Sequence, residues 1–414
     1  MRALLLLILA SCTHDLTVFD RVDVRPARDL DILFVLDNSP DWGTYDQMAS
    51  QLDVFQARLK DVDGQLPNLH VGVTTTDLGT RGSLDAAPGP AVGRCAGTGN
   101  AGNLVTFKAG LADTFLEDLR GPDGTRVRNF PSSSLPFELA QLTNPVLAGP
   151  GCDYGQPLEA MRLALDPNKT PGFIRPGAML AVVFLGTHDD CSLAHSGLLD
   201  PDDPSLGFPG SFRCTEQGVI CDPDDPRRPG VKTNCRPRDG SPFLTDVSTY
   251  RTFLEQYKPD PRDVVVSAVA GPRSRFEVQD LGFPVLAPSC QGAGGNARPA
   301  VRLGALVDSF GGALVDGCSQ DAAYQQITAP IVARQRSCLP NLRQPDGEDC
   351  TVIEIAGTAQ TELARCADGG PSPCWYTYRD AAACPGGDHL GIAVRRGTTT
   401  APASSRIEAT CFLK

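Results

Sequence analysis

The sequence lacks several features that would place it in a common functional class. No segment reaches the roughly 20 apolar residues of a membrane-spanning helix. The apolar run at the N-terminus covers only residues 3–9. Acidic residues outnumber basic ones, with 49 Asp and Glu against 37 Lys and Arg and a net charge of −12. That balance excludes the basic face of a nucleic-acid-binding protein. No Cys-x-x-Cys pair offers a zinc spacing, and no Gly-x-Ser-x-Gly motif supports an esterase.

The N-terminus has the layout of an export signal. A charged start and the apolar run lead into Leu-Ala-Ser-Cys, which ends at Cys12 and resembles a bacterial lipobox. The resemblance implies that residues 1–11 are a lipoprotein signal peptide and that Cys12 is acylated. An ordinary signal peptide with a chance cysteine is the alternative. The residue after Cys12 is Thr13 and not Asp. In many Gram-negative bacteria this resembles the signal that sends a lipoprotein on to the outer membrane. We therefore expect an envelope lipoprotein whose membrane anchor is the lipid on Cys12, followed by a tether over residues 12–30.

The cysteine count fits an oxidising compartment. There are 15 cysteines, so 14 remain if Cys12 carries the lipid, and an even number allows every one to pair. The connectivity cannot be read from the sequence.

The order of predicted elements indicates an α/β domain over residues 31–337. Continuous apolar runs predict buried strands at 31–37, 69–73, 179–185 and 264–270, with shorter strands at 104–107 and 313–315. Helical spacing predicts helices at 41–60, 111–119, 156–165, 245–257, 301–310 and 321–334. This alternation is typical of an open, doubly wound, mostly parallel, Rossmann-like sheet with helices on both faces.

Two cysteine-rich segments accompany this domain. Residues 191–241 are rich in Pro, Asp and Gly and contain four cysteines, so we expect a disulfide-stapled insertion with little regular structure. Residues 338–414 contain six cysteines and short strands without helices between them. This pattern predicts a small C-terminal β module, which needs disulfides because its core is small. Its six cysteines could all pair within the module.

The segment after the first buried strand carries a family resemblance. Asp37-Asn38-Ser39, with Asp41 two residues later, resembles the Asp-x-Ser-x-Ser motif of von Willebrand factor A (VWA) domains. In that family the motif forms part of a metal-ion-dependent adhesion site. The resemblance matches Asp37 and Ser39 to the first two ligand positions and Asp41 to the place of the second Ser. The family's Thr is missing from the loop that contains Asp153, and its last Asp is replaced by Thr187, with Asp189 and Asp190 close by.

The same acidic residues converge without the family resemblance. Loops at the carboxyl ends of parallel strands meet at one edge of a sheet, and these loops hold Asp37, Ser39, Asp41, Asp153, Asp189 and Asp190. Several carboxylates require a cation or hydrogen-bond donors, and hard oxygen ligands suit Ca²⁺ or Mg²⁺, with Ca²⁺ favoured by the number of Asp. A metal-free site, in which Asp37 and Ser39 cap a helix and Asp189 and Asp190 form a turn, stays open.

These features predict a protein that binds a protein or peptide ligand and is not an enzyme. The first alternative is a metal-assisted phosphoester hydrolase, because Asp37 after a buried strand resembles the nucleophile of haloacid-dehalogenase-type phosphatases. That family has a second Asp where this chain has Ser39. The second alternative is an inert structural component of an envelope assembly.

Overall fold

The computed structural model separates the chain into two compact units. It describes residues 19–24, 29–39, 51–60, 64, 66–105, 114–121, 125–132, 134–147, 151–292, 295–319, 322–339, 350–367, 371–381, 383–384, 386–396 and 406–412. The α/β unit comprises Ala27–Gln335, and the β unit comprises Met1–Pro26 together with Arg336–Lys414. Each unit is described by itself.

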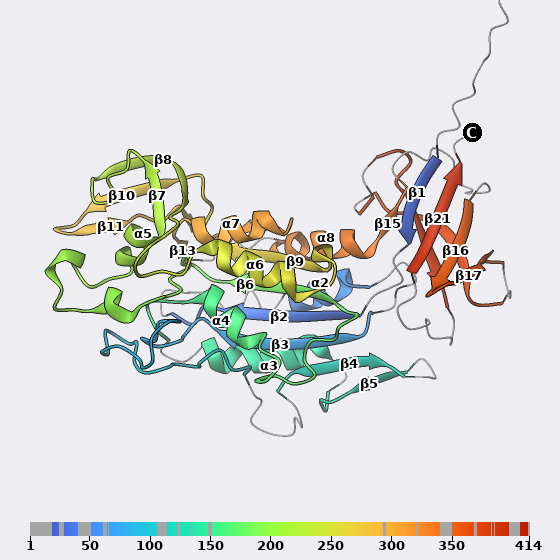
Figure 1. Ribbon diagram of the computed structural model, residues 1–414, viewed down its shortest axis with the longest axis horizontal. Coiled ribbons are helices and arrows are strands. Elements are labelled where there is room, and N and C mark those ends of the chain that lie inside the picture. Colours follow the sequence, from blue (N-terminus) through green and yellow to red (C-terminus); the bar gives the residue numbers. More distant parts are fainter. Residues whose placement is uncertain are drawn as a thin grey trace, which may run out of the picture. The chain divides into compact units, whose positions relative to one another are not determined.

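The α/β unit is built around a seven-stranded mixed sheet (Figure 1). Its strands lie in the order β14 (Leu314–Asp316), β9 (Val264–Ala270), β6 (Met179–Leu185), β2 (Leu30–Leu36), β3 (Leu69–Thr75), β4 (Leu116–Arg120) and β5 (Arg126–Arg128). The first five are parallel, and β4 and β5 pair antiparallel at one edge. The predicted apolar runs therefore form the buried strands, as expected for a sheet covered on both faces.

Two apolar clusters alternate along each central strand. In β2, Ile32 and Phe34 belong to the cluster that includes side chains of three helices, α2 (Leu52–Arg58), α3 (Leu135–Leu147) and α8 (Ala323–Gln335). Leu33 and Val35 belong to the other cluster, with α4 (Pro157–Ala164), α6 (Val247–Tyr257) and α7 (Val301–Ser309). Successive strand residues point to opposite faces, so this alternation shows that helices cover both faces of the sheet.

Two local predictions differ from the structure, and a third is described only in part. The helix predicted at 111–119 is wrong where it is described, because β4 occupies Leu116–Arg120 and pairs with β3. Residues 104–105 of the predicted strand at 104–107 are not in a strand, although the Val105 amide donates to the Val73 carbonyl at 2.7 Å. Of the helix predicted at 41–60, the described part is α2, and residues 41–50 lie outside the described residues.

The segment 191–241 contains more regular structure than the sequence suggested. It includes short 3₁₀ turns (Ser196–Leu199 and Pro204–Leu206), α5 (Phe212–Gly218), β7 (Val219–Asp222) and β8 (Gly230–Pro237). β7 and β8 join β10 (Phe276–Asp280) and β11 (Pro284–Leu286) in a second, four-stranded sheet (Figure 1). Cys191–Cys214 and Cys221–Cys235 confirm the stapling. The buried Arg213 donates to the carbonyls of Leu198, Asp200 and Gly207, which gathers the irregular chain around one side chain.

The β unit consists of two four-stranded sheets around a small core. One holds β1 (Phe19–Val24), β21 (Arg406–Phe412), β16 (Cys350–Ala356) and β17 (Ala359–Glu362). The other holds β15 (Ser337–Cys338), β20 (Leu390–Arg395), β19 (Cys374–Arg379) and β18 (Ala364–Arg365). The tether predicted over residues 12–30 is wrong at 19–24, because this segment is β1 and pairs antiparallel with β21. Cys12 and the predicted signal peptide, residues 1–11, lie outside the described residues.

Disulfides pair all 14 cysteines of the described residues. The β unit holds Cys338–Cys384, Cys350–Cys411 and Cys366–Cys374, and the α/β unit holds Cys95–Cys152 and Cys290–Cys318 besides the two of the insertion. The prediction of full pairing in an oxidising compartment, with internal pairing of the C-terminal six, is therefore confirmed. None of the helices in the described residues is long and apolar enough to cross a membrane.

Candidate functional site

The sheet brings three loops of the α/β unit to one edge. In the sheet, β3 lies on one side of β2 and β6 on the other, so the connections after β2 and β6 leave in different directions. Ligands of open α/β sheets bind at such a reversal of strand order, outside the carboxyl ends of the strands. The residues at this place are Asp37 to Ser39 after β2, Thr76 after β3, and Thr187 to Asp190 after β6.

Asp37 is a buried carboxylate with several donors. The residue is only 4% exposed. Oδ1 accepts from the Ser39 amide at 2.9 Å, and Oδ2 accepts from the Thr187 amide at 3.3 Å. His188 Nδ1 lies 3.2 Å from Oδ2. Burial alone would raise the pKa of Asp37, but the hydrogen bond and electrostatic attraction of His188, together with the hydrogen bonds from Ser39, outweigh it and hold the pKa below the usual 3.8. Asp37 is therefore ionised at neutral pH.

His188 connects Asp37 to an arginine that sequence reasoning missed. Nδ1 of His188 also lies 3.3 Å from Ser39 Oγ and 3.2 Å from Thr187 Oγ1. Nε2 contacts Nη1 of Arg298, and the Arg298 amide donates to the Thr187 carbonyl at 2.9 Å. Arg298 follows the hairpin of β12 (Cys290–Gly292) and β13 (Gly295–Ala297), and no sequence motif marks it.

Asp189 caps α7. Its two carboxylate oxygens accept from the amides of Val301, Arg302 and Leu303 at 2.9–3.0 Å. These donors are the first amides of the helix, which have no partner inside it. Removal from water raises the pKa of Asp189 to about 6, although the amide hydrogen bonds act in the opposite direction.

Asp190 caps α4 and forms a buried ion pair. Oδ1 accepts from the Leu158 amide at 3.1 Å, and Oδ2 lies 3.0 Å from Nε of Arg302. Both side chains of the pair are almost fully buried. The two acidic residues that follow β6 thus fix the helices α7 and α4 at this edge of the sheet.

The predicted oxygen cluster is only partly assembled. The structure brings Asp37 and Ser39 together, whereas Asp153 Oδ1 pairs with Arg94 Nη2 at 3.0 Å in a partly exposed contact. Asp41 lies outside the described residues. Ca²⁺ takes six to eight oxygen ligands, but the carboxylate oxygens of Asp37, Asp189 and Asp190 already accept hydrogen bonds. The described residues of this cluster therefore do not fit a hard divalent cation.

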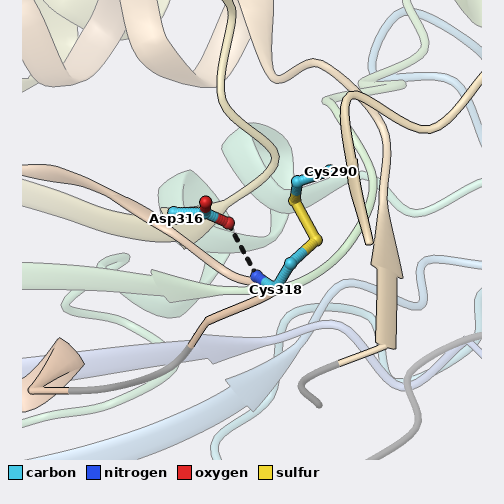
Figure 2. A group of neighbouring side chains, drawn as sticks. All are labelled: Cys290, Asp316 and Cys318. Atoms are coloured by element: carbon cyan, nitrogen blue, oxygen red, sulfur yellow. Dashed lines mark hydrogen bonds between the residues drawn. A yellow bond between two sulfur atoms is a disulfide. The ribbon is translucent and has the colours of Figure 1, made fainter. Parts of the chain in front are cut away.

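A different group of side chains has the composition of a metal site. Figure 2 shows Cys290, Asp316 and Cys318, whose possible ligand atoms lie within 4.8 Å of one another. The group could bind a metal, but the two sulfurs form a disulfide, and Asp316 Oδ1 accepts from the Cys318 amide at 2.8 Å. Because a thiolate and not a disulfide sulfur is the metal ligand, this group would need reduction first. Its sulfurs do not suit Ca²⁺ or Mg²⁺.

The edge of the sheet also holds polar atoms without partners. Asn38 Oδ1, Thr76 Oγ1 and Tyr154 Oη are buried and have no hydrogen-bond partner among the described residues. Thr76 lines a small hollow with Asp37, Gly155 and His188, and Asn38 lines a wider, open and more polar one. An unpaired buried polar atom costs about 1–3 kcal/mol, so the edge has unused capacity for hydrogen bonding.

Comparisons with known proteins find only weak structural similarity. No family model and no curated protein matches the sequence. The human COPII-coat protein Sec24c is similar with a TM-score of 0.34 and 11% identity, over 94% of this chain and 44% of that one. The adhesive tip pilin GBS104 of Streptococcus agalactiae gives 0.32 and 11%, over 96% and 81%, and the pilus adhesin RrgA of Streptococcus pneumoniae gives 0.31 and 9%, over 96% and 58%.

The similarity does not establish a family. The chain spans less than half of Sec24c, and at these TM-scores the likeness carries no argument about activity. What the structure shows is a mixed α/β sheet in a disulfide-rich protein of an oxidising compartment.

Proposed function

We propose that this protein is an exported binding protein with a VWA-like, doubly wound domain that recognises a protein or peptide ligand. The strand order supports the fold assignment. Counted along the chain from β2, the strands of the sheet up to β14 follow the order 3-2-1-4-5-6, known from doubly wound sheets, once the edge hairpin strand β5 is set aside. The Asp-x-Ser motif stands at the end of the first of these strands, where the VWA resemblance requires it.

The observation that carries the function is the set of unpaired polar atoms at the sheet edge. Of the two that line the hollows, Asn38 Oδ1 can only accept a hydrogen bond, while the hydroxyl of Thr76 can donate or accept. A peptide backbone presents both amide donors and carbonyl acceptors. A bound peptide would therefore satisfy atoms that are costly to leave buried without a partner.

The hydrolase alternative is less well supported. A nucleophilic Asp37 would need a free oxygen in reach of substrate, but it is buried and both its oxygens accept hydrogen bonds. A general base must reach the proton that it removes, and His188 has its Nδ1 against Asp37 and its Nε2 against Arg298. We therefore propose binding and not catalysis, and an inert envelope component is the outcome if no ligand is found.

Selection of peptides on the full, disulfide-intact chain tests the proposal. From a displayed random library, wild type should enrich peptides whose affinity falls about five- to tenfold when Thr76→Val removes one hydroxyl without changing the side-chain shape, since one hydrogen bond contributes about 1 kcal/mol. Titration of synthetic peptides against both proteins measures the difference. Thr358→Val, an exposed hydroxyl in the β unit, is the control and should leave the affinity unchanged. Peptides that bind both variants equally would place the ligand elsewhere, and no enrichment would favour the inert component.

We further propose that the chain is held in the outer membrane by lipid on Cys12. The support is the lipobox-like sequence and the oxidising environment that the disulfides require. In a Gram-negative host, mass spectrometry of the N-terminal peptide should show cleavage before Cys12 and a diacylglyceryl-linked, acylated cysteine. Cys12→Ser should release the protein from the membrane fraction, and Thr13→Ser is the control that keeps the anchor. An uncleaved N-terminus, or an unmodified Cys12, would contradict the anchor.

A further inference from the structure

We infer that His188 and Arg298 take the place of the divalent cation that the VWA resemblance implies at the end of β2, so that the site works without a metal. That a ligand binds at this edge rests on the proposed function, whereas the exclusion of a metal follows from the contacts of the site alone.

The contact with Arg298 fixes where the proton of His188 lies. A guanidinium has donors but no acceptor, so the His188 Nε2 that faces Arg298 Nη1 must accept. A neutral imidazole then carries its proton on Nδ1, which lies 3.2 Å from Asp37 Oδ2 and donates to it. A protonated ring nitrogen cannot coordinate a metal ion. Arg298 thus sets the tautomer that excludes His188 as a ligand.

The ring also fills the approach to the oxygen ligands. Nδ1 lies 3.2 Å from Asp37 Oδ2, 3.3 Å from Ser39 Oγ and 3.2 Å from Thr187 Oγ1. Ca²⁺ or Mg²⁺ would lie about 2.0–2.6 Å from such oxygens. An ion that approached these oxygens from the side of the imidazole ring would therefore lie close to the Nδ1 proton. The positive ion and the positively polarised N–H group would repel each other.

Arg298 offers Asp37 a positive charge without a metal. A buried carboxylate such as Asp37 requires a compensating positive charge or donors. The guanidinium of Arg298 contacts the imidazole that donates to Asp37, so it stabilises the negative charge of Asp37 through the ring. The other acidic residues after β6 offer little to an ion, because Asp189 accepts from three amides of α7 and Asp190 is paired with Arg302.

The position of Arg298 is constrained by its surroundings. Its amide donates to Thr187 on the loop after β6, and the hairpin just before it closes through a hydrogen bond from the Ser289 amide to the Ala297 carbonyl at 2.8 Å. Cys290 at the start of that hairpin is bridged to Cys318 beyond β14. The guanidinium therefore belongs to a cross-linked segment, as a replacement for a fixed ion requires.

Nuclear magnetic resonance of histidine nitrogens tests the inference directly. The chain has only five histidines, so selective ¹⁵N-histidine labelling gives a countable spectrum, and the signal lost in His188→Gln identifies this ring. In wild type we expect a protonated Nδ1 and an unprotonated Nε2, unchanged by excess Ca²⁺, Mg²⁺ or a chelator. Arg298→Leu should abolish this tautomer preference. Arg94→Leu, which removes another arginine of the same edge that pairs with Asp153, should keep it.

Calorimetry on the same proteins gives an independent readout. Wild type should show no 1:1 binding of Ca²⁺ or Mg²⁺ at millimolar concentrations. One-to-one binding that Asp37→Ala removes would overturn the inference, as would an unprotonated Nδ1 or a tautomer that is unaffected by Arg298→Leu. These measurements use no peptide, so failure of the peptide selection leaves them valid. If peptides are found, their affinity should be the same with and without a chelator.

Discussion

Replacing Arg302 with methionine is expected to lower the free energy of unfolding by about 3–5 kcal/mol, because one partner of a buried ion pair is lost. Arg302 is fully buried; its Nε lies 3.0 Å from Asp190 Oδ2 and its Nη2 donates to the Thr245 carbonyl at 2.6 Å. Methionine keeps much of the volume but leaves the Asp190 carboxylate without its cation. Denaturant titration, monitored by circular dichroism, measures the loss.

An exposed pair at the same helix provides the control for this substitution. Arg273 pairs with Asp308 of α7 at 2.8 Å, but both side chains are exposed. Such pairs contribute about 0–1 kcal/mol, so Arg273→Met should have little effect. The double variant Arg302→Met with Asp190→Asn should recover part of the lost stability, because no buried charge remains. Equal losses for Arg302→Met and Arg273→Met would show that burial does not set the strength of the pair.

Removing the bridge Cys350–Cys411 by two alanine substitutions is expected to destabilise the β unit by about 4 kcal/mol, on the chain-entropy model of disulfides. The bridge joins β16 to β21 across a sequence separation of 61, and the unit has only a small apolar core. We expect the β unit to melt at a lower temperature while the α/β unit keeps its own transition. Differential scanning calorimetry resolves the two transitions.

A second bridge of the same unit tests the physical reason for this loss. Cys366–Cys374 spans a sequence separation of only 8, so the same model gives about 2.5 kcal/mol. The loss on removing Cys350–Cys411 should therefore be the larger one. If the short bridge proves as important as the long one, the stabilisation comes from packing around the sulfurs and not from restriction of the unfolded chain.

The sequence predicted those parts of the fold whose pattern is local. The strands β2, β6 and β9 are continuous apolar runs, and α4, α6 and α7 show helical spacing, so each is recognisable by itself. β4 was missed because Phe115, Leu116 and Leu119 also fit a helical spacing, and only pairing with β3 decides for a strand. β8 was missed because a largely exposed strand has no apolar run to detect.

The sequence predicted where the candidate site lies, but not which side chains interact there. The edge of the sheet follows from strand order, and Asp37 and Ser39 were expected there together. His188 contacts Asp37, which lies 151 positions away in the sequence. Asp189 and Asp190 meet the first amides of α7 and α4, and Arg298 meets His188, through contacts between distant segments. No local pattern reveals such pairings.

The pairing of β1 with β21 sets an order of events during biosynthesis. Phe19 pairs in register with Phe412, so β1 has no neighbour until the chain has been synthesised as far as residue 412. The intervening Ala27–Gln335 forms a compact unit of its own and can fold meanwhile. In a nascent or truncated chain that ends before residue 406, β1 has no partner strand. Its unpaired backbone groups could then pair with another chain and cause aggregation, or the segment could be cleaved by a protease. Only a chain that includes residues 406–412 can close this seam.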